Sequence, residues 1–147
     1  MINIETTNIC NLSCSFCPHF KMKRGQGVMS LKDFKRTINL FNSDIVGLTN
    51  FGEPFMDKNI FDKINYVKKS YTYLTTNGTF LTKNIVSQIL KSNLSELRVS
   101  VYSDDVKEKV ENLLRIKTDA LKVSVCATEY SSYWDRLGVL RYREPHN

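Results

Sequence analysis

The sequence predicts one α/β domain of about five to six parallel βα units, arranged as an open curved sheet or a partial barrel. Short runs rich in Val, Ile, Leu and Thr alternate with longer segments whose apolar residues recur at helical spacing. Strands that alternate with helices in this way pair in parallel through right-handed crossovers. The chain has 147 residues, and a complete eight-stranded barrel needs about 200 at minimum, so the complete barrel is excluded.

The first predicted strand and the first predicted helix flank a cysteine-rich loop. Residues 2–6 alternate between apolar and polar side chains, which predicts a strand. Ser30 is the expected N-cap of a helix that runs through Asn42, with Asp33 at the capping-box position. The apolar positions of this helix recur at helical spacing and are Phe34, Ile38 and Phe41.

Two strands and a helix are expected in the middle of the chain. Residues 44–51 are rich in Ile, Val, Leu and Thr, which predicts a strand that ends in a turn at residues 52–54. A helix follows over 59–69, and a strand over 71–75 leads into an Asn-Gly turn at residues 76–78. The helix would bury one face, which carries Ile60, Phe61, Ile64 and Val67.

The later elements repeat this alternation. They are a helix capped by Thr82, a strand over 97–102, a helix over 104–116 and a strand over 121–126. The pattern is weaker over 127–147, where a short helix around Trp134 and a sixth strand over 139–142 are expected. We expect residues 1–147 to form a single domain.

Composition and charge narrow the function classes. Twenty-one Lys and Arg against fifteen Asp and Glu give a net charge of +6. These charges are spread along the chain, so we expect a solvated surface and no nucleic-acid partner. No apolar run reaches the about 18 residues of a membrane span, and the first residues lack the basic and apolar regions of a signal peptide. A cytoplasmic protein without a membrane partner is expected.

The four cysteines are the strongest functional signal. In a reducing cytosol, clustered cysteines bind metal or do chemistry rather than form disulfides. Cys10, Cys14 and Cys17 are clustered on the loop after the first strand, where parallel α/β folds gather their ligands. Cys126 lies far from them in a predicted buried strand, and we expect it to be a small core residue.

Three thiolates on one short loop can bind three corners of an iron–sulfur cube. Four irons normally take four protein thiolates, so the fourth iron would be open to a substrate or a cofactor. A structural zinc site made of the three cysteines and His19 is an alternative, although zinc ligands usually come as two separated pairs. Cysteines without any shared function are the remaining alternative.

The cysteine segment resembles a known family signature. Residues 10–17, CNLSCSFC, are similar to the CxxxCxxC motif of radical S-adenosylmethionine (radical SAM) enzymes, in which an aromatic residue precedes the third cysteine. The resemblance implies a partial (β/α) barrel in which Cys10, Cys14 and Cys17 bind a 4Fe–4S cluster. It also implies S-adenosyl-L-methionine as cofactor, cleaved reductively to a 5′-deoxyadenosyl radical that abstracts hydrogen from a substrate. An external electron donor of the flavodoxin or ferredoxin type is implied as well.

A second motif lies at the end of the second predicted strand. Gly52, Glu53 and Pro54 match the GGEP motif of the family, with Phe51 in place of its first glycine. The match implies that this turn contacts the amino group of S-adenosyl-L-methionine. A carboxylate suits an ammonium donor, glycine permits close approach of the backbone, and proline fixes the turn.

Three more cofactor-binding residues are implied by the resemblance. Asn77 lies in a segment similar to the TNG motif that follows the third strand, at the cofactor face. Ser100 matches a serine near the ribose or the carboxylate of the cofactor, although Tyr102 and Ser103 replace the Asp and Gly that follow it in relatives. Phe16 is expected to pack beside the adenine.

The resemblance covers roughly residues 1–126. The sequence around Pro18 and His19 is most similar to the SPASM or twitch subgroup, but the C-terminal cysteine-rich extension of that subgroup is not expected here. The predicted function is a radical SAM enzyme that acts on a peptide or a small molecule, with no catalytic side chain nominated. A truncated, non-catalytic relative that binds the cluster, or the small zinc-binding module, is the alternative.

Overall fold

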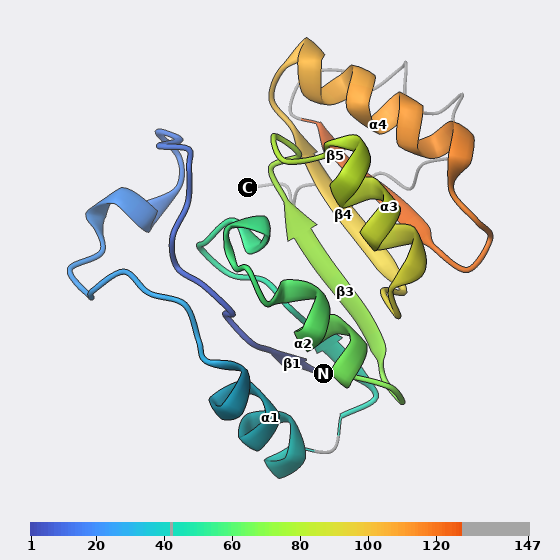
Figure 1. Cartoon of the computed structure of the whole chain (residues 1–147). Coiled ribbons are helices and arrows are strands. Elements are labelled where there is room, and N and C mark those ends of the chain that lie inside the picture. The colour runs from blue at the N-terminus through green and yellow to red at the C-terminus, as the bar shows by residue number, and fades with distance from the viewer. Residues whose placement is uncertain (42, 128–147) are drawn as a thin grey trace.

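Residues 1–41 and 43–127 are described by the computed structural model, and their strands form one five-stranded parallel sheet (Figure 1). The strands lie in chain order: β1 (Ile2–Asn3), β2 (Ile45–Gly47), β3 (Tyr71–Thr76), β4 (Glu96–Val101) and β5 (Lys122–Ala127). The α-helices between them are α1 (Leu31–Leu40), α2 (Ile60–Tyr66), α3 (Lys83–Lys91) and α4 (Asp104–Ile116). The predicted α/β class and the parallel pairing are confirmed. The helix and the sixth strand expected after residue 127 lie outside the described residues.

Local side-chain bonds start three of the helices. Ser30 accepts a hydrogen bond from the backbone N–H of Asp33 at 3.0 Å, and its hydroxyl donates to the Asp33 carboxylate at 2.6 Å. Thr82 and Ser103 cap α3 and α4 by accepting from the backbone N–H groups of Ile85 and Val106. These caps satisfy backbone donors that a helix leaves unpaired at its start, which is why the sequence could place these three boundaries.

The hydrophobic core lies between the sheet and its helices. Helices α2, α3 and α4 cover one face of the sheet (Figure 1). Because successive strand residues point to opposite faces, every second residue of a strand faces these helices. The buried apolar residues of the strands include Val46, Leu74, Leu97, Val99, Val123 and Val125, and those of the helices include Phe34, Ile64, Val110 and Leu113.

The first two strands are shorter than predicted. The sequence predicts strands over 2–6 and 44–51, but β1 ends at Asn3 and β2 at Gly47. After β1 the chain turns to another partner, since Thr7 bridges to Val28 and the N–H of Met29 donates to the carbonyl of Thr6. The alternating pattern did not reveal this change of partner, which closes the base of the cysteine loop.

The prediction that Cys126 belongs to the core is wrong. Val123 and Val125 are buried on the helix-covered face, so the pleat of β5 turns Cys126 to the opposite face. There it is only partly buried, lies outside the buried apolar cluster and is in register with Ser100 of β4.

Within the described ranges, no helix has the length and apolar character required to cross a bilayer.

Candidate functional site

The cysteine loop follows β1 and extends beyond the carboxyl end of the sheet (Figure 1). Cys10, Cys14 and Cys17 are partly buried free thiols. The N–H of Cys17 donates to the carbonyl of Cys14 at 3.1 Å, and the N–H of Leu12 donates to Sγ of Cys10 at 3.5 Å. Partial burial, together with the charges of Cys10 and Cys17, raises the pKa of the Cys14 thiol. The three sulfurs therefore influence one another, and a bound cation would favour their ionised forms.

The cysteine side chains of the loop do not converge on a single point. Over residues 1–41 and 43–127, no three His, Cys, Asp or Glu side chains gather closely enough to hold one metal ion. A ring nitrogen of His19, Nε2, lies 2.7 Å from the carbonyl of Asn8. Because a carbonyl only accepts, this nitrogen carries the proton and is engaged with the backbone. An iron–sulfur cube takes its thiolates at separate corners, so it does not require such convergence.

The base of the cysteine loop is closed by the side chain of Asn8. Its Nδ2 donates to the carbonyl of Gly25 at 2.9 Å, and its Oδ1 accepts from the N–H of Gly27 at 2.6 Å. The hydroxyl of Thr7 adds a bond to the carbonyl of Gly27 at 3.0 Å. These contacts join residues 7–8 to residues 25–27, so the cysteines lie on a loop whose two ends are fixed together.

The Gly52-Glu53 turn packs directly against the start of this loop. The N–H of Glu53 donates to the carbonyl of Ile9 at 2.8 Å. A Cβ on Gly52 would lie 2.1 Å from the carbonyl oxygen of Thr7, so no other residue fits here without moving backbone. Pro54 is buried and begins the 3₁₀ helix η2 (Pro54–Met56). A glycine is therefore required at position 52 because the backbone of this turn lies directly against the backbone of residues 7–8.

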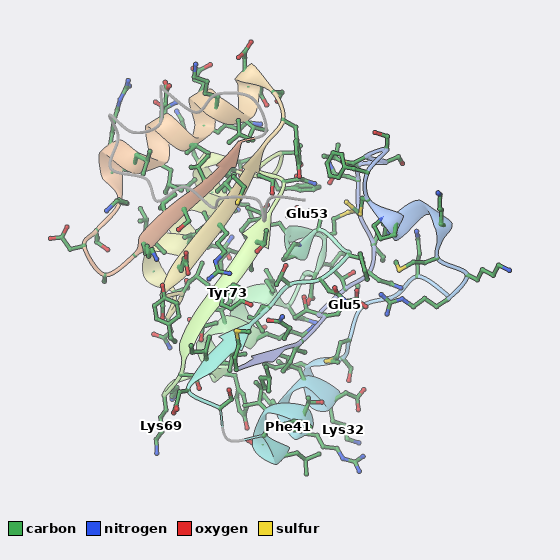
Figure 2. The ribbon with its side chains drawn as sticks, turned by 180° about the vertical axis from the view of Figure 1, so that it is seen from behind. Glu5, Lys32, Phe41, Glu53, Lys69 and Tyr73 are labelled. Carbon is green, nitrogen blue, oxygen red and sulfur yellow. The ribbon has the colours of Figure 1, made fainter. Side chains whose placement is uncertain are left out.

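The carboxylate of Glu53 is buried and bonded to its own chain. Glu53 is 1% exposed and lies near the carboxyl end of β3, whereas Lys69, before that strand, lies at the opposite end of the sheet (Figure 2). It accepts from the hydroxyl of Thr76 at 2.7 Å and from the backbone N–H groups of Asn77 and Phe55 at 2.8 and 3.2 Å. Burial raises the pKa of Glu53, and these three bonds oppose that rise. Glu53 therefore fixes the end of β3 against the turn that follows β2.

The side chain of Asn77 contacts the cysteine loop. It donates to Asn11 at 2.8 Å, lies 4.0 Å from Sγ of Cys10 and accepts from Thr79. The sequence placed Asn77 at the cofactor face but missed Asn11 and Thr79. Asn11 stands at a position of the CxxxCxxC spacing that specifies no residue type, so no signal in the motif could have found it.

Two exposed aromatic rings join the cysteine loop to the end of β4. The centroids of Phe16 and Tyr102 lie 5.6 Å apart, with the rings tilted by 47°. Phe16 is 67% exposed and Tyr102 is 44% exposed, so their outer faces are open to a ligand. Burial raises the pKa of Tyr102, and a hydrogen bond with Ser100 opposes the rise. The structure thus brings both predicted residues, Phe16 and Ser100, into contact with Tyr102.

A polar network lines the face of the sheet opposite to helices α2, α3 and α4, and no sequence motif predicted it. The guanidinium of Arg98 stacks 3.7 Å from the ring centroid of Tyr73 and donates to Glu96 at 2.9 Å. Ser124 and Tyr71 also donate to Glu96, at 2.6 and 3.1 Å. Burial opposes ionisation of Glu96, but the bonds from Arg98 and Ser124 outweigh it and lower the pKa of Glu96 to about 2. This face is therefore polar and charged below the site.

Fold and site together define a parallel α/β protein of partial-barrel type, with a three-cysteine loop at the carboxyl edge of its sheet. The family model of the radical SAM superfamily matches residues 4–130, and the chain belongs to this superfamily. Membership confirms the predicted family, and it gives the chain its cofactors, a 4Fe–4S cluster and S-adenosyl-L-methionine.

Individual relatives agree with this assignment. Over 115 residues the chain is 29% identical to the antilisterial bacteriocin subtilosin biosynthesis protein AlbA of Bacillus subtilis, covering 76% of this chain and 25% of AlbA. Over 112 residues it is 27% identical to the S-adenosyl-L-methionine-dependent 2-deoxy-scyllo-inosamine dehydrogenase of Niallia circulans, covering 70% of this chain and 45% of that protein. The chain thus spans less than half the length of either relative.

A solved structure shares the fold. The crystal structure of BtrN in complex with AdoMet and 2-DOIA superposes with a TM-score of 0.68 at 22% identity, covering 86% of this chain and 55% of that one. At this identity the likeness concerns the fold, and it confirms the predicted partial barrel.

Proposed function

We propose that this chain is the cofactor-binding part of an enzyme that cleaves S-adenosyl-L-methionine reductively and uses the resulting radical to take hydrogen from a substrate. The observation that carries the proposal is the fixed three-cysteine loop at the carboxyl edge of a radical SAM fold. When bound, the cluster supplies one electron, and the cofactor supplies the 5′-deoxyadenosyl radical. The chain itself binds, orients and shields these groups.

The proposed cluster ligands are Cys10, Cys14 and Cys17. All three are free thiols, partly buried, and they lie on one loop whose two ends are joined by the bonds of Asn8 and Thr7 to residues 25–27. Three thiolates leave one iron of a 4Fe–4S cluster open. That open position is where S-adenosyl-L-methionine would bind.

The proposed cofactor contacts lie on both sides of the cysteine loop. On one side, Gly52, Glu53 and Pro54 would meet the methionine part, with the buried Glu53 holding this turn against the end of β3. On the other side, Phe16 would pack beside the adenine and Ser100 would lie near the ribose or the carboxylate. The exposed outer faces of the Phe16 and Tyr102 rings suit a flat base.

The proposed partners follow from the reaction. The cluster must receive an electron from outside, so we propose a flavodoxin- or ferredoxin-type donor, and the net charge of +6 favours an acidic protein. A cytoplasmic location belongs to the same proposal, because reducing conditions keep the cysteines available for iron. The substrate is proposed to be a peptide or a small molecule that enters over the polar face of the sheet.

Anaerobic reconstitution tests the proposal. We expect a brown protein with about four irons per chain that forms 5′-deoxyadenosine when reductant and S-adenosyl-L-methionine are added. Cys14→Ala should lose the cluster, whereas Cys126→Ala, which removes the thiol outside the loop, should keep it. A colourless protein that binds one zinc, or a Cys14→Ala variant with full iron content, would refute the proposal.

A further inference from the structure

The amide of Asn77 is the centre of a hydrogen-bond network between the β3–α3 turn and the cysteine loop. Its Oδ1 accepts from the backbone N–H of Thr79 at 3.0 Å and from the hydroxyl of Thr79 at 2.6 Å. Its Nδ2 donates to Oδ1 of Asn11 at 2.8 Å and to Sγ of Cys10 at 4.0 Å. The network closes on itself, since Nδ2 of Asn11 donates to the hydroxyl of Thr79 at 3.0 Å.

The orientation of this amide follows from its partners. A backbone N–H can only donate, so the Asn77 atom that faces the N–H of Thr79 must be the carbonyl oxygen. The amide nitrogen is then turned to the cysteine loop, where its two hydrogens meet two acceptors, the oxygen of Asn11 and the sulfur of Cys10.

The backbone of Asn77 is held independently of its side chain. Its N–H donates to Glu53 at 2.8 Å, and Glu53 is 1% exposed and bonded to Thr76 as well. The next residue, Gly78, has a φ of +76° and would clash with Val106 if it carried a Cβ. The amide of Asn77 is thus presented to Cys10 from a rigid turn, which a substitution of the side chain alone would leave in place.

We infer that Asn77 is a positioning residue that holds the Cys10 thiolate through an N–H···S hydrogen bond and so raises the reduction potential of the cluster. Adding one electron increases the negative charge on the cluster sulfurs, so a donor at a ligand sulfur stabilises the reduced state more than the oxidised state. The inference rests on the proposed function, because it requires a cluster on Cys10. It differs from a direct contact of Asn77 with S-adenosyl-L-methionine, which would leave the potential of the cofactor-free cluster unchanged.

The test is a redox titration of the reconstituted cluster, followed by its electron paramagnetic resonance signal in the absence of S-adenosyl-L-methionine. The variants are Asn77→Leu, which has a similar volume, and Asn77→Ala. We expect the equilibrium constant for reduction to fall by up to about tenfold in both, which is 59 mV for a one-electron couple. Thr79→Val is the matched control: it removes a hydroxyl from the same network but keeps the backbone N–H that orients Asn77, so its potential should match the wild type.

The outcomes separate this inference from the proposed function. Wild-type protein that takes up no cluster would overturn both. Wild-type protein that holds the cluster and forms 5′-deoxyadenosine, with the same potential in all Asn77 variants, would overturn the inference alone. An equal fall in the reduction potential of Thr79→Val would overturn the inference too, since the change in potential would then come from loosening of the cysteine loop. If both Asn77 variants melt normally but lose iron while Thr79→Val retains it, the positioning of Cys10 by Asn77 is supported.

Discussion

The buried ion pair of Lys63 and Asp57 gives a quantitative test of how the cysteine loop is held. Both side chains are 0% exposed. The ammonium of Lys63, on α2, donates to the Asp57 carboxylate and to the backbone carbonyl of Met29. Met29 lies in the segment by which the chain returns from the cysteine loop, so a single side chain joins that segment to α2 and to the turn after Glu53.

Replacement of Lys63 by Met would leave the Asp57 carboxylate buried without its cation. Breaking a buried pair by removing one partner costs about 3–5 kcal/mol, and the lost bond to the Met29 carbonyl is part of this cost. Since domains are stable by about 5–15 kcal/mol, we expect Lys63→Met to remove a large part of the free energy of unfolding.

The measurement is the free energy of unfolding from urea denaturation followed by circular dichroism. The double variant Lys63→Met/Asp57→Asn removes the unpaired charge but keeps an oxygen that can accept from the N–H of Asn59, at 2.9 Å in the native protein. We expect it to recover at least about 2 kcal/mol relative to Lys63→Met. Lys58→Met, at an exposed position nearby, should stay within about 0.5 kcal/mol of the wild type.

Two results would refute this reasoning. One is a loss below about 1 kcal/mol in Lys63→Met, which would mean that water or a rearranged side chain replaces the cation. The other is a double variant as unstable as the single one, because the cost would then come from packing of the lysine stem rather than from the charge left on Asp57.

Three further predictions follow from the site. Gly52→Ala should destabilise the fold by about 3 kcal/mol or more, since its Cβ would lie 2.1 Å from the Thr7 carbonyl oxygen. Gly27→Ala is the control and should be tolerated, because no atom lies within 4 Å of its Cβ. Thermal unfolding measures the stability of both variants. The pKa of Glu96 is lowered from 4.5 to about 2, so its contribution to stability, about 3 kcal/mol, is present above pH 4.5 and lost as the pH falls towards 2. Denaturation across this range should show a loss that Glu96→Gln lacks. Tyr102→Leu removes a ring contact worth about 1 kcal/mol, so the dissociation constant for S-adenosyl-L-methionine should rise about fivefold in equilibrium dialysis.

Each of these predictions has a result that contradicts it. Equal melting temperatures of Gly52→Ala and the wild type would show that the two backbones do not approach so closely. If wild type and Glu96→Gln lose stability in parallel between pH 4.5 and 2, the loss comes from other carboxylates. Unchanged affinity in Tyr102→Leu, at full cluster content, would place the adenine away from the aromatic pair.

The sequence predicted the starts of α1, α3 and α4 because their causes are local, whereas α1 and α2 end at Leu40 and Tyr66, before the predicted ends at residues 42 and 69. Ser30, Thr82 and Ser103 each cap a helix through a bond to a backbone N–H three residues ahead, so the signal and the structure lie in the same short window. The strand ends were less predictable. Residues 6–8 pair with residues 27–29 instead of continuing β1, and alternation of apolar side chains does not say which segment a strand will meet.

The candidate site likewise has features that the sequence predicted and features that it did not. The spacing of Cys10, Cys14 and Cys17 on one loop was visible because it is a property of eight consecutive residues. By contrast, the bond between Asn11 and Thr79 joins residues 68 positions apart, and nothing near either residue indicates the other. Cys126 was assigned to the wrong face, since a strand pattern gives the period of two but not which face the helices cover.

Periodicity, helix caps and short motifs depend on neighbouring residues, so the alternation of strands and helices, the cysteine loop and the family could all be predicted without the structure. The partners of the Glu53 carboxylate and of the Asn77 amide, by contrast, could be identified only in the folded chain. Those partners come from strand ends and loops that meet only when the parallel register of β1 to β5 is formed. Register is set by packing of the whole core, so it cannot be predicted from a local pattern of residues.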